Sequence, residues 1–120
     1  MTRGTGVVRR YLHAMEKGDL AATLACFTDE AIVNSPVYGA VAARPFYERL
    51  FADTVRAELD ILDIYVAESD ERRVIAHFNY KWERYNKPVM ETRLIDLFEL
   101  DLFSGNISLL RIIFDDRAGA

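Results

Sequence analysis

The spacing between hydrophobic residues changes partway along the chain. In the N-terminal part they recur at intervals of three and four positions, and this stripe predicts an amphipathic helix with Val7, Tyr11 and Met15 on its apolar face. From residue 57 onward, hydrophobic and polar residues mostly alternate, which is typical of strands that bury one face. The pattern therefore predicts helices first and a sheet afterwards.

Three helices are expected before the sheet. Gly18 favours a left-handed exit from the first helix, and Asp19 is a side-chain N-cap for the second. The second helix carries its apolar face as far as Phe27 and ends in an acidic turn over residues 28–30. The third helix is expected to begin near residues 42–45. Pro45 is compatible with this start, because proline is tolerated in the first turn of a helix.

Five strands are expected, one of them among the helices. The short early strand covers residues 31–34, and Pro36 ends it because proline lacks a backbone donor. A loop through Gly39 then leads to the third helix. The four later strands cover residues 57–67, 72–84, 89–103 and 107–114, with turns at 69–71, 85–88 and 104–106.

The four later strands follow one another directly, so they predict an antiparallel meander that curls over the helices. The whole chain, residues 1–120, then forms one α+β domain. In the first strand of the meander the inward-facing positions change parity between Ile61 and Leu62, which predicts a β-bulge. In the next strand, His77 falls on the face opposite Phe78.

Composition narrows the class of partner. The chain is 51% hydrophobic and 28% charged, which is typical of a globular protein. Its net charge of -4 and its lack of long basic runs argue against nucleic acid as a partner. No run approaches the ~20 apolar residues of a membrane span, and no stretch resembles a signal peptide. We expect a soluble, cytoplasmic protein.

The cysteine and the histidines do not predict a metal or cofactor site. Cys26 is the only cysteine, and its place at the end of an apolar helix favours a packed thiol over a nucleophile. His13 and His77 lie in no metal-ligand spacing. The prediction is therefore no metal and no cofactor.

Residues 94–98 are apolar on both faces of their strand, with one exception. One face meets the helices, and the other most simply meets a second copy of the protein, so a homodimer is expected. The exception is Asp96, which has no basic residue near it on its own face. A lone carboxylate in an apolar interior is costly, so we expect Asp96 to be protonated and to donate a hydrogen bond. The alternative is an aspartate that caps a loop or binds a backbone amide.

Two tyrosines on apolar helix faces form a candidate site together with Asp96. Tyr11 and Tyr47 carry hydroxyls that have little reason to lie there unless something uses them. With Asp96 they can direct several hydrogen-bond donors at one ligand oxygen. Six aromatic residues are candidates for the pocket walls: Phe46, Phe78, Tyr80, Trp82, Phe98 and Phe114. The alternative for the aromatic set is ordinary core packing.

Residues that match the sequence pattern of a known family occur along nearly the whole chain. They are the runs 7–11, 18–20 and 27–31, then Pro36, Val37, Gly39, Arg44, Phe46 and Tyr47, and finally Ile95, Asp96, Phe98 and the run 111–114. In these residues the chain resembles the bacterial ketosteroid isomerases. The resemblance implies membership of the superfamily of cone-shaped α+β barrels that includes nuclear transport factor 2 and SnoaL-type polyketide cyclases. Its fold would place three N-terminal helices on a curved, mostly antiparallel sheet.

The resemblance also implies roles for three residues. In the isomerases a tyrosine of the first helix and a protonated aspartic acid of the sheet form an oxyanion hole. These positions match Tyr11 and Asp96, and the supporting tyrosine matches Tyr47. The family's general base is an aspartate immediately before a proline, where this chain has Ser35. A serine hydroxyl is no base near neutral pH, and the neighbouring Asn34 does not ionise either.

Two functional hypotheses follow. In the first, the protein is an isomerase or cyclase that binds a small hydrophobic ketone, steroid-like or polyketide-like, and polarises its carbonyl with Tyr11 and Asp96. The proton would then be moved by the substrate, by a water held by Ser35 and Asn34, or by Asp96. In the second, the same pocket binds an apolar carbonyl compound without turnover, or the domain serves mainly in dimerisation. A SnoaL-type cyclase or dehydratase is a further alternative.

Overall fold

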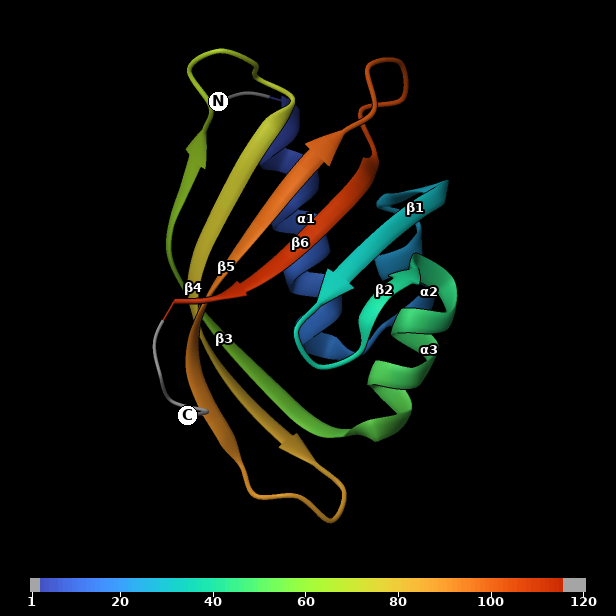
Figure 1. Cartoon of the computed structure of the whole chain (residues 1–120), viewed down its shortest axis with the longest axis vertical. Coiled ribbons are helices and arrows are strands. Elements are labelled where there is room, and N and C mark those ends of the chain that lie inside the picture. Colours follow the sequence, from blue (N-terminus) through green and yellow to red (C-terminus); the bar gives the residue numbers. More distant parts are fainter. Residues whose placement is uncertain (1–2, 116–120) are drawn as a thin grey trace.

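The computed structural model describes residues 3–115, which form three helices and six strands (Figure 1). The helices are α1 (Arg3–Lys17), α2 (Leu20–Leu24) and α3 (Ala43–Asp53). The strands are β1 (Phe27–Ser35), β2 (Gly39–Ala42), β3 (Thr54–Val66), β4 (Arg73–Arg84), β5 (Met90–Leu100) and β6 (Ile107–Phe114). The predicted α+β class and the order of helices before the sheet are confirmed.

All six strands belong to one sheet in the order β2-β1-β6-β5-β4-β3. The meander from β3 to β6 is antiparallel, as predicted, but β1 joins its end by pairing parallel to β6. The sheet is curved and mostly antiparallel, and it does not close, since β2 and β3 are its two edges. In Figure 1, α1 runs across one face of the sheet, behind the strands, while α2 and α3 lie beside β1 and β2.

The early segment differs from the prediction in two places. The second helix ends at Leu24, and the residues expected to form an acidic turn are part of β1. Phe27 is buried and pairs with Ile107, while Asp29 and Glu30 are exposed. Because consecutive residues of this strand are polar and exposed, its sequence resembles that of a polar turn. The expected loop through Gly39 instead begins strand β2, which pairs with β1 in a tight hairpin.

Other local predictions are confirmed. The register of β3 on β4 moves from Ile61–Phe78 to Asp63–His77, which leaves Leu62 as the extra residue of a β-bulge. Gly18 has φ 67° at the end of α1, where a side chain would be strained. The Asp19 carboxylate accepts a hydrogen bond from the amide of Ala22 at 3.0 Å, so it caps α2.

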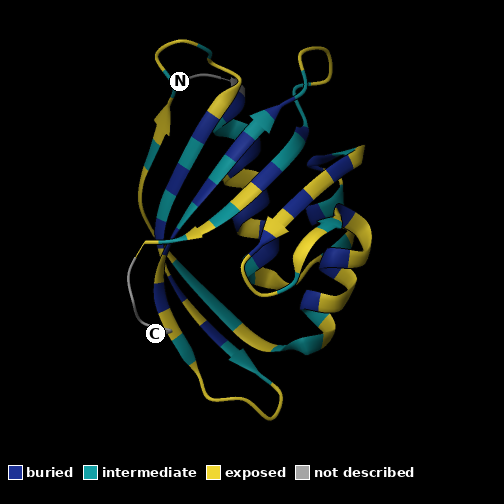
Figure 2. Ribbon diagram, viewed as in Figure 1, coloured by how far each residue is buried: buried dark blue, intermediate teal, exposed yellow. Residues whose placement is uncertain are grey.

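The core lies between the helices and the inner face of the sheet. Buried and less buried residues alternate along β4 and β5, as Figure 2 shows, because successive side chains of a strand point to opposite faces. Val8 and Leu12 of α1 pack into this core, and Cys26 is buried there as a free thiol. His77 faces the other way, and its Nε2 lies 2.6 Å from Oδ2 of Asp115.

Membrane insertion through a helix is not supported by the part of the chain that the structure describes. None of its helices combines the length and the apolar character that a membrane crossing requires.

Candidate functional site

A cavity lies between the helices and the sheet. Its walls come from α1, the turn between β1 and β2, α3, and the inward-facing residues of β4, β5 and β6. The walls are mostly apolar, and the cavity has a volume of about 40 Å³. Since one water needs about 10–15 Å³ by this measure, the cavity has room for only a few small groups.

Asp96 is the buried acid of this cavity. The alternation along β5 turns Thr92, Leu94, Asp96 and Phe98 inward, and Asp96 is only 1% exposed. Its Oδ1 atom has no hydrogen-bond partner among the residues that the structure describes. Burial raises the pKa of Asp96 from its ordinary 3.8 to about 8, because the charged form loses its hydration. Near neutral pH, Asp96 is therefore mostly a neutral carboxylic acid that can donate a hydrogen bond.

Tyr11 and Tyr47 are joined by a short hydrogen bond between their hydroxyl oxygens, 2.6 Å apart. Tyr11 lines the cavity from α1, whereas Tyr47 of α3 is completely buried behind it. Burial raises the pKa of both tyrosines well above the usual value, and the nearby Asp96 carboxyl adds to this shift. Both hydroxyls therefore stay protonated, and Tyr47 fixes the position of the Tyr11 hydroxyl.

Ser35 lies at the cavity wall but is already engaged. Its Oγ accepts hydrogen bonds from the amides of Val37 at 3.0 Å and Tyr38 at 3.4 Å, so the hydroxyl holds the turn that follows β1. Asn34 is on the other face of β1, exposed, and does not line the cavity. The structure therefore does not bring Ser35 and Asn34 together around one water position.

Five of the six predicted aromatic wall residues line the cavity: Phe46, Phe78, Tyr80, Trp82 and Phe114. The sixth, Phe98, is fully buried in the core, with its ring centroid 5.5 Å from that of Tyr11. Its ring packs edge-on against that of Tyr11 and does not line the cavity.

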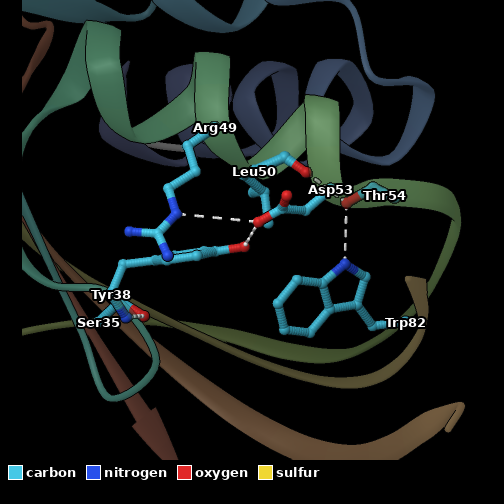
Figure 3. A network of polar contacts seen from close by, with 7 residues as sticks. All are labelled: Ser35, Tyr38, Arg49, Leu50, Asp53, Thr54 and Trp82. Atoms are coloured by element: carbon cyan, nitrogen blue, oxygen red, sulfur yellow. Dashed lines mark hydrogen bonds and ion pairs between the residues drawn. The ribbon is translucent and has the colours of Figure 1, made fainter. Parts of the chain in front are cut away.

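Tyr38 is a polar-tipped site residue that the sequence did not indicate, and the aliphatic wall residues Met15, Leu50, Met90, Leu94 and Ile112 were not predicted as walls either. It comes from the turn between β1 and β2, and its hydroxyl donates to Oδ2 of Asp53 at 2.8 Å (Figure 3). The Arg49 guanidinium lies 4.4 Å from the centre of the Tyr38 ring, and its Nε is 3.9 Å from the same Asp53 oxygen. The aromatic residue follows a Ser-Pro-Val run with no periodicity, so no pattern in the sequence marks it.

Trp82 is held in place at the same end of the cavity. Its indole N–H donates to Oγ1 of Thr54 at 2.8 Å, and that hydroxyl donates to the backbone oxygen of Leu50 at 2.6 Å (Figure 3). The Arg84 guanidinium covers the indole ring at 4.3 Å. The ring orientation of Trp82 is thus fixed from two sides.

Comparison with known proteins identifies the class. The family model for the SnoaL-like domain matches residues 8–108, and the chain belongs to this family. No curated protein sequence matches the chain.

Solved structures show the same fold. The epoxide hydrolase/cyclase-like enzyme SalBIII, which has a role in pyran ring formation in the polyether salinomycin, matches with a TM-score of 0.82 at 16% identity, covering 97% of this chain and 93% of SalBIII. A protein with a ketosteroid isomerase-like fold from Catenulispora acidiphila, in complex with trimethylamine, matches with a TM-score of 0.75 at 14% identity, covering 89% and 83%.

A third structure, a protein of unknown function with a cystatin-like fold from Methylobium petroleophilum, matches with a TM-score of 0.75 at 22% identity, covering 94% of this chain and 76% of that chain. At such identities the likeness shows the fold alone. It confirms the expected fold of three helices on a curved, mostly antiparallel sheet, which these structures carry under the names NTF2-like, ketosteroid isomerase-like and cystatin-like.

Proposed function

We propose that this protein binds a small hydrophobic carbonyl compound, with Tyr11 and Asp96 donating hydrogen bonds to its oxygen. The observation that carries the proposal is a fully buried carboxylic acid in an apolar cavity, with an oxygen that has no partner within the described part of the chain. A buried polar group without a partner costs about 1–3 kcal/mol, so such groups are rare outside functional sites. A ligand oxygen that meets Asp96 removes this cost.

The two tyrosines supply the second donor. Two hydroxyls carry two protons, and the contact between Tyr11 and Tyr47 uses one of them. Because Tyr47 lies behind Tyr11 and does not reach the cavity, the productive arrangement has Tyr47 donating to Tyr11. The Tyr11 proton is then free for a ligand oxygen. An enolate or phenolate oxygen gains most from this pair of donors, since negative charge strengthens hydrogen bonds in a dry site.

Binding is the primary function in this proposal, and turnover depends on Asp96 itself. Among the described residues that line the cavity, Asp96 carries the only carboxyl group, so none of them offers a second carboxylate as a base. The Ser35 hydroxyl is engaged with two backbone amides. A group with a pKa of about 8 can accept and return a proton near neutral pH, which makes Asp96 the candidate acid-base group of an isomerase or cyclase.

The test measures how tightly the protein binds phenol, which resembles an enol. Binding is monitored through the NMR signals of the protein's amides during a titration. Tyr11→Phe and Asp96→Leu each remove one donor while keeping similar bulk. Each should weaken phenol binding about 10-fold or more, as expected for about 1.4 kcal/mol per hydrogen bond. Asp63→Asn, an exposed change on β3, is the control and should leave binding unchanged. Equal affinity of all four proteins would refute the proposal.

A catalytic arm uses Ser35→Asp. An aspartate side chain can accept the same two amide hydrogen bonds as the serine, so the turn should persist while a carboxylate is added to the cavity wall. We expect this variant to isomerise a small unconjugated enone faster than the wild type. If a folded Ser35→Asp variant still binds phenol but isomerises the enone no faster than the wild type, a missing base is not the only reason for low activity.

The outer face of the sheet supports a homodimer as part of the same proposal. Ile75, Ile95 and Leu97 lie side by side there, partly exposed, and Ile113 beside them is 40% exposed. A contiguous apolar patch on a sheet face is a typical interface between copies of one chain. The polar pair His77 and Asp115 would lie at its rim.

A further inference from the structure

One wall of the cavity comes from a turn instead of a helix or a central strand. Tyr38 lies in the turn between β1 and β2, and its ring meets Phe46 of α3 edge-on, with centroids 5.5 Å apart. On its other side is Trp82 of β4, at 6.4 Å between centroids. All three rings line the cavity, so Tyr38 fills the space between the helix and the sheet.

The contacts that hold Tyr38 in this place come from the end of α3. Its hydroxyl donates to Asp53, and Arg49 lies over its ring while approaching the same carboxylate (Figure 3). Partial burial, with Asp53 adding to it, raises the pKa of Tyr38 to about 12, so the hydroxyl remains a donor throughout the physiological pH range. These polar contacts are partly exposed, and a side chain held this way can be released without opening the core.

Several of the other wall residues are on elements that cannot yield as easily. Phe78 and Asp96 are on strands paired on both sides, and the ring of Phe46 is buried under α3. The turn that carries Tyr38 leads instead into β2, a short strand at the edge of the sheet that pairs with β1 alone. Tyr38 is therefore a wall residue that can move aside without disturbing the centre of the sheet.

We infer that Tyr38 is the residue that limits ligand size, and that the site takes compact carbonyl or phenolic compounds with at most one ring while Tyr38 contacts Asp53. This inference rests on the proposed function. The cavity offers about 40 Å³, less than the about 150 Å³ of an apolar cavity that holds one benzene ring, so a single ring already needs some movement of the walls and a second ring needs more. A fused-ring ligand that reaches Asp96 must take the space of the Tyr38 ring and break its hydrogen bond to Asp53.

The experiment compares the dissociation constants of phenol and 2-naphthol by NMR titration, in the wild type and in Tyr38→Ala. A larger ligand tends to bind more tightly because it buries more apolar surface. The informative quantity is therefore the ratio of the naphthol to the phenol dissociation constant, compared between the wild type and the variant. We expect the naphthol-to-phenol ratio to fall at least 10-fold in Tyr38→Ala. Tyr85→Ala, a change at an exposed tyrosine of the β4–β5 turn, is the matched control and should leave the ratio unchanged.

Asp53→Ala provides a second, independent variant, because it removes the acceptor and leaves the Tyr38 ring in place. It should lower the ratio in the same direction, by at least twofold, and it decides the question if Tyr38→Ala does not fold. A ratio that is unchanged in the folded variants overturns the role of Tyr38, while phenol binding that still depends on Asp96 upholds the proposed function. If the wild type binds neither phenol nor naphthol, the proposed function fails, and the size limit fails with it.

Discussion

Replacing Asp96 by asparagine should make the protein more stable, and by an amount that grows with pH. The wild-type carboxyl has a pKa of about 8 in the folded protein against an ordinary 3.8 when unfolded. Between these values the folded chain holds a proton that the unfolded chain has lost. The free energy of unfolding of the wild type therefore falls as pH rises through this window, and it levels off above it.

The magnitude follows from the size of the window. Each pH unit inside it changes the free energy of unfolding by about 1.36 kcal/mol, so raising the pH from 5 to 7 costs the wild type about 2.7 kcal/mol through Asp96. Over the whole window the loss approaches about 6 kcal/mol, comparable with the total stability of a small domain. Asparagine does not titrate and keeps nearly the same shape.

The assay is urea unfolding of both proteins at pH 5, 6, 7 and 8. All other ionisable groups are common to the two chains, so the difference between their unfolding free energies isolates position 96. This difference should increase by about 1 kcal/mol or more per pH unit up to pH 8, where the increase begins to slow. A difference that is constant from pH 5 to 8 would refute the reasoning, since it would mean that Asp96 ionises in the folded protein as it does in the unfolded chain.

Two further predictions concern the tyrosine pair and the outer sheet face. Tyr47→Phe leaves the Tyr11 hydroxyl buried without its partner, so the free energy of unfolding should fall by about 1–3 kcal/mol. Thermal denaturation checks this, and an unchanged midpoint would contradict it. The partly exposed isoleucines and leucine of the outer sheet face should give a dimer in light scattering at micromolar concentration. A monomer there would exclude the proposed interface, and Ile95→Lys should convert the expected dimer to a monomer.

Local patterns in the sequence were enough for most of the fold. Alternation predicted the bulge at Leu62 and the inward direction of Asp96, because the faces of a strand follow directly from residue parity. The bounds of the last strand, residues 107–114, also agree with the structure. The same patterns gave the capping role of Asp19.

Features that depend on distant partners were not predictable in this way. The parallel pairing of β1 with β6 leaves no local mark, and the exposed Asp29 and Glu30 made the start of β1 resemble a turn. Tyr38 belongs to the site because its hydroxyl reaches Asp53 on another element, which is a matter of packing. Phe98 has the same alternation as the wall residues, yet its ring packs edge-on against Tyr11 and does not line the cavity.

The pairing of β1 with β6 has a consequence for how the protein is made. The turn that carries Tyr38 directly follows β1 in the chain. β1 can pair with β6 only after β6 has been synthesised. Local hairpins such as β3–β4 and β4–β5 can form early, but contacts between distant parts of a chain form slowly. We therefore expect the candidate site to be one of the last parts of the molecule to be assembled. A chain released before Ile107 would expose an unfinished sheet edge at β5, and such edges promote aggregation.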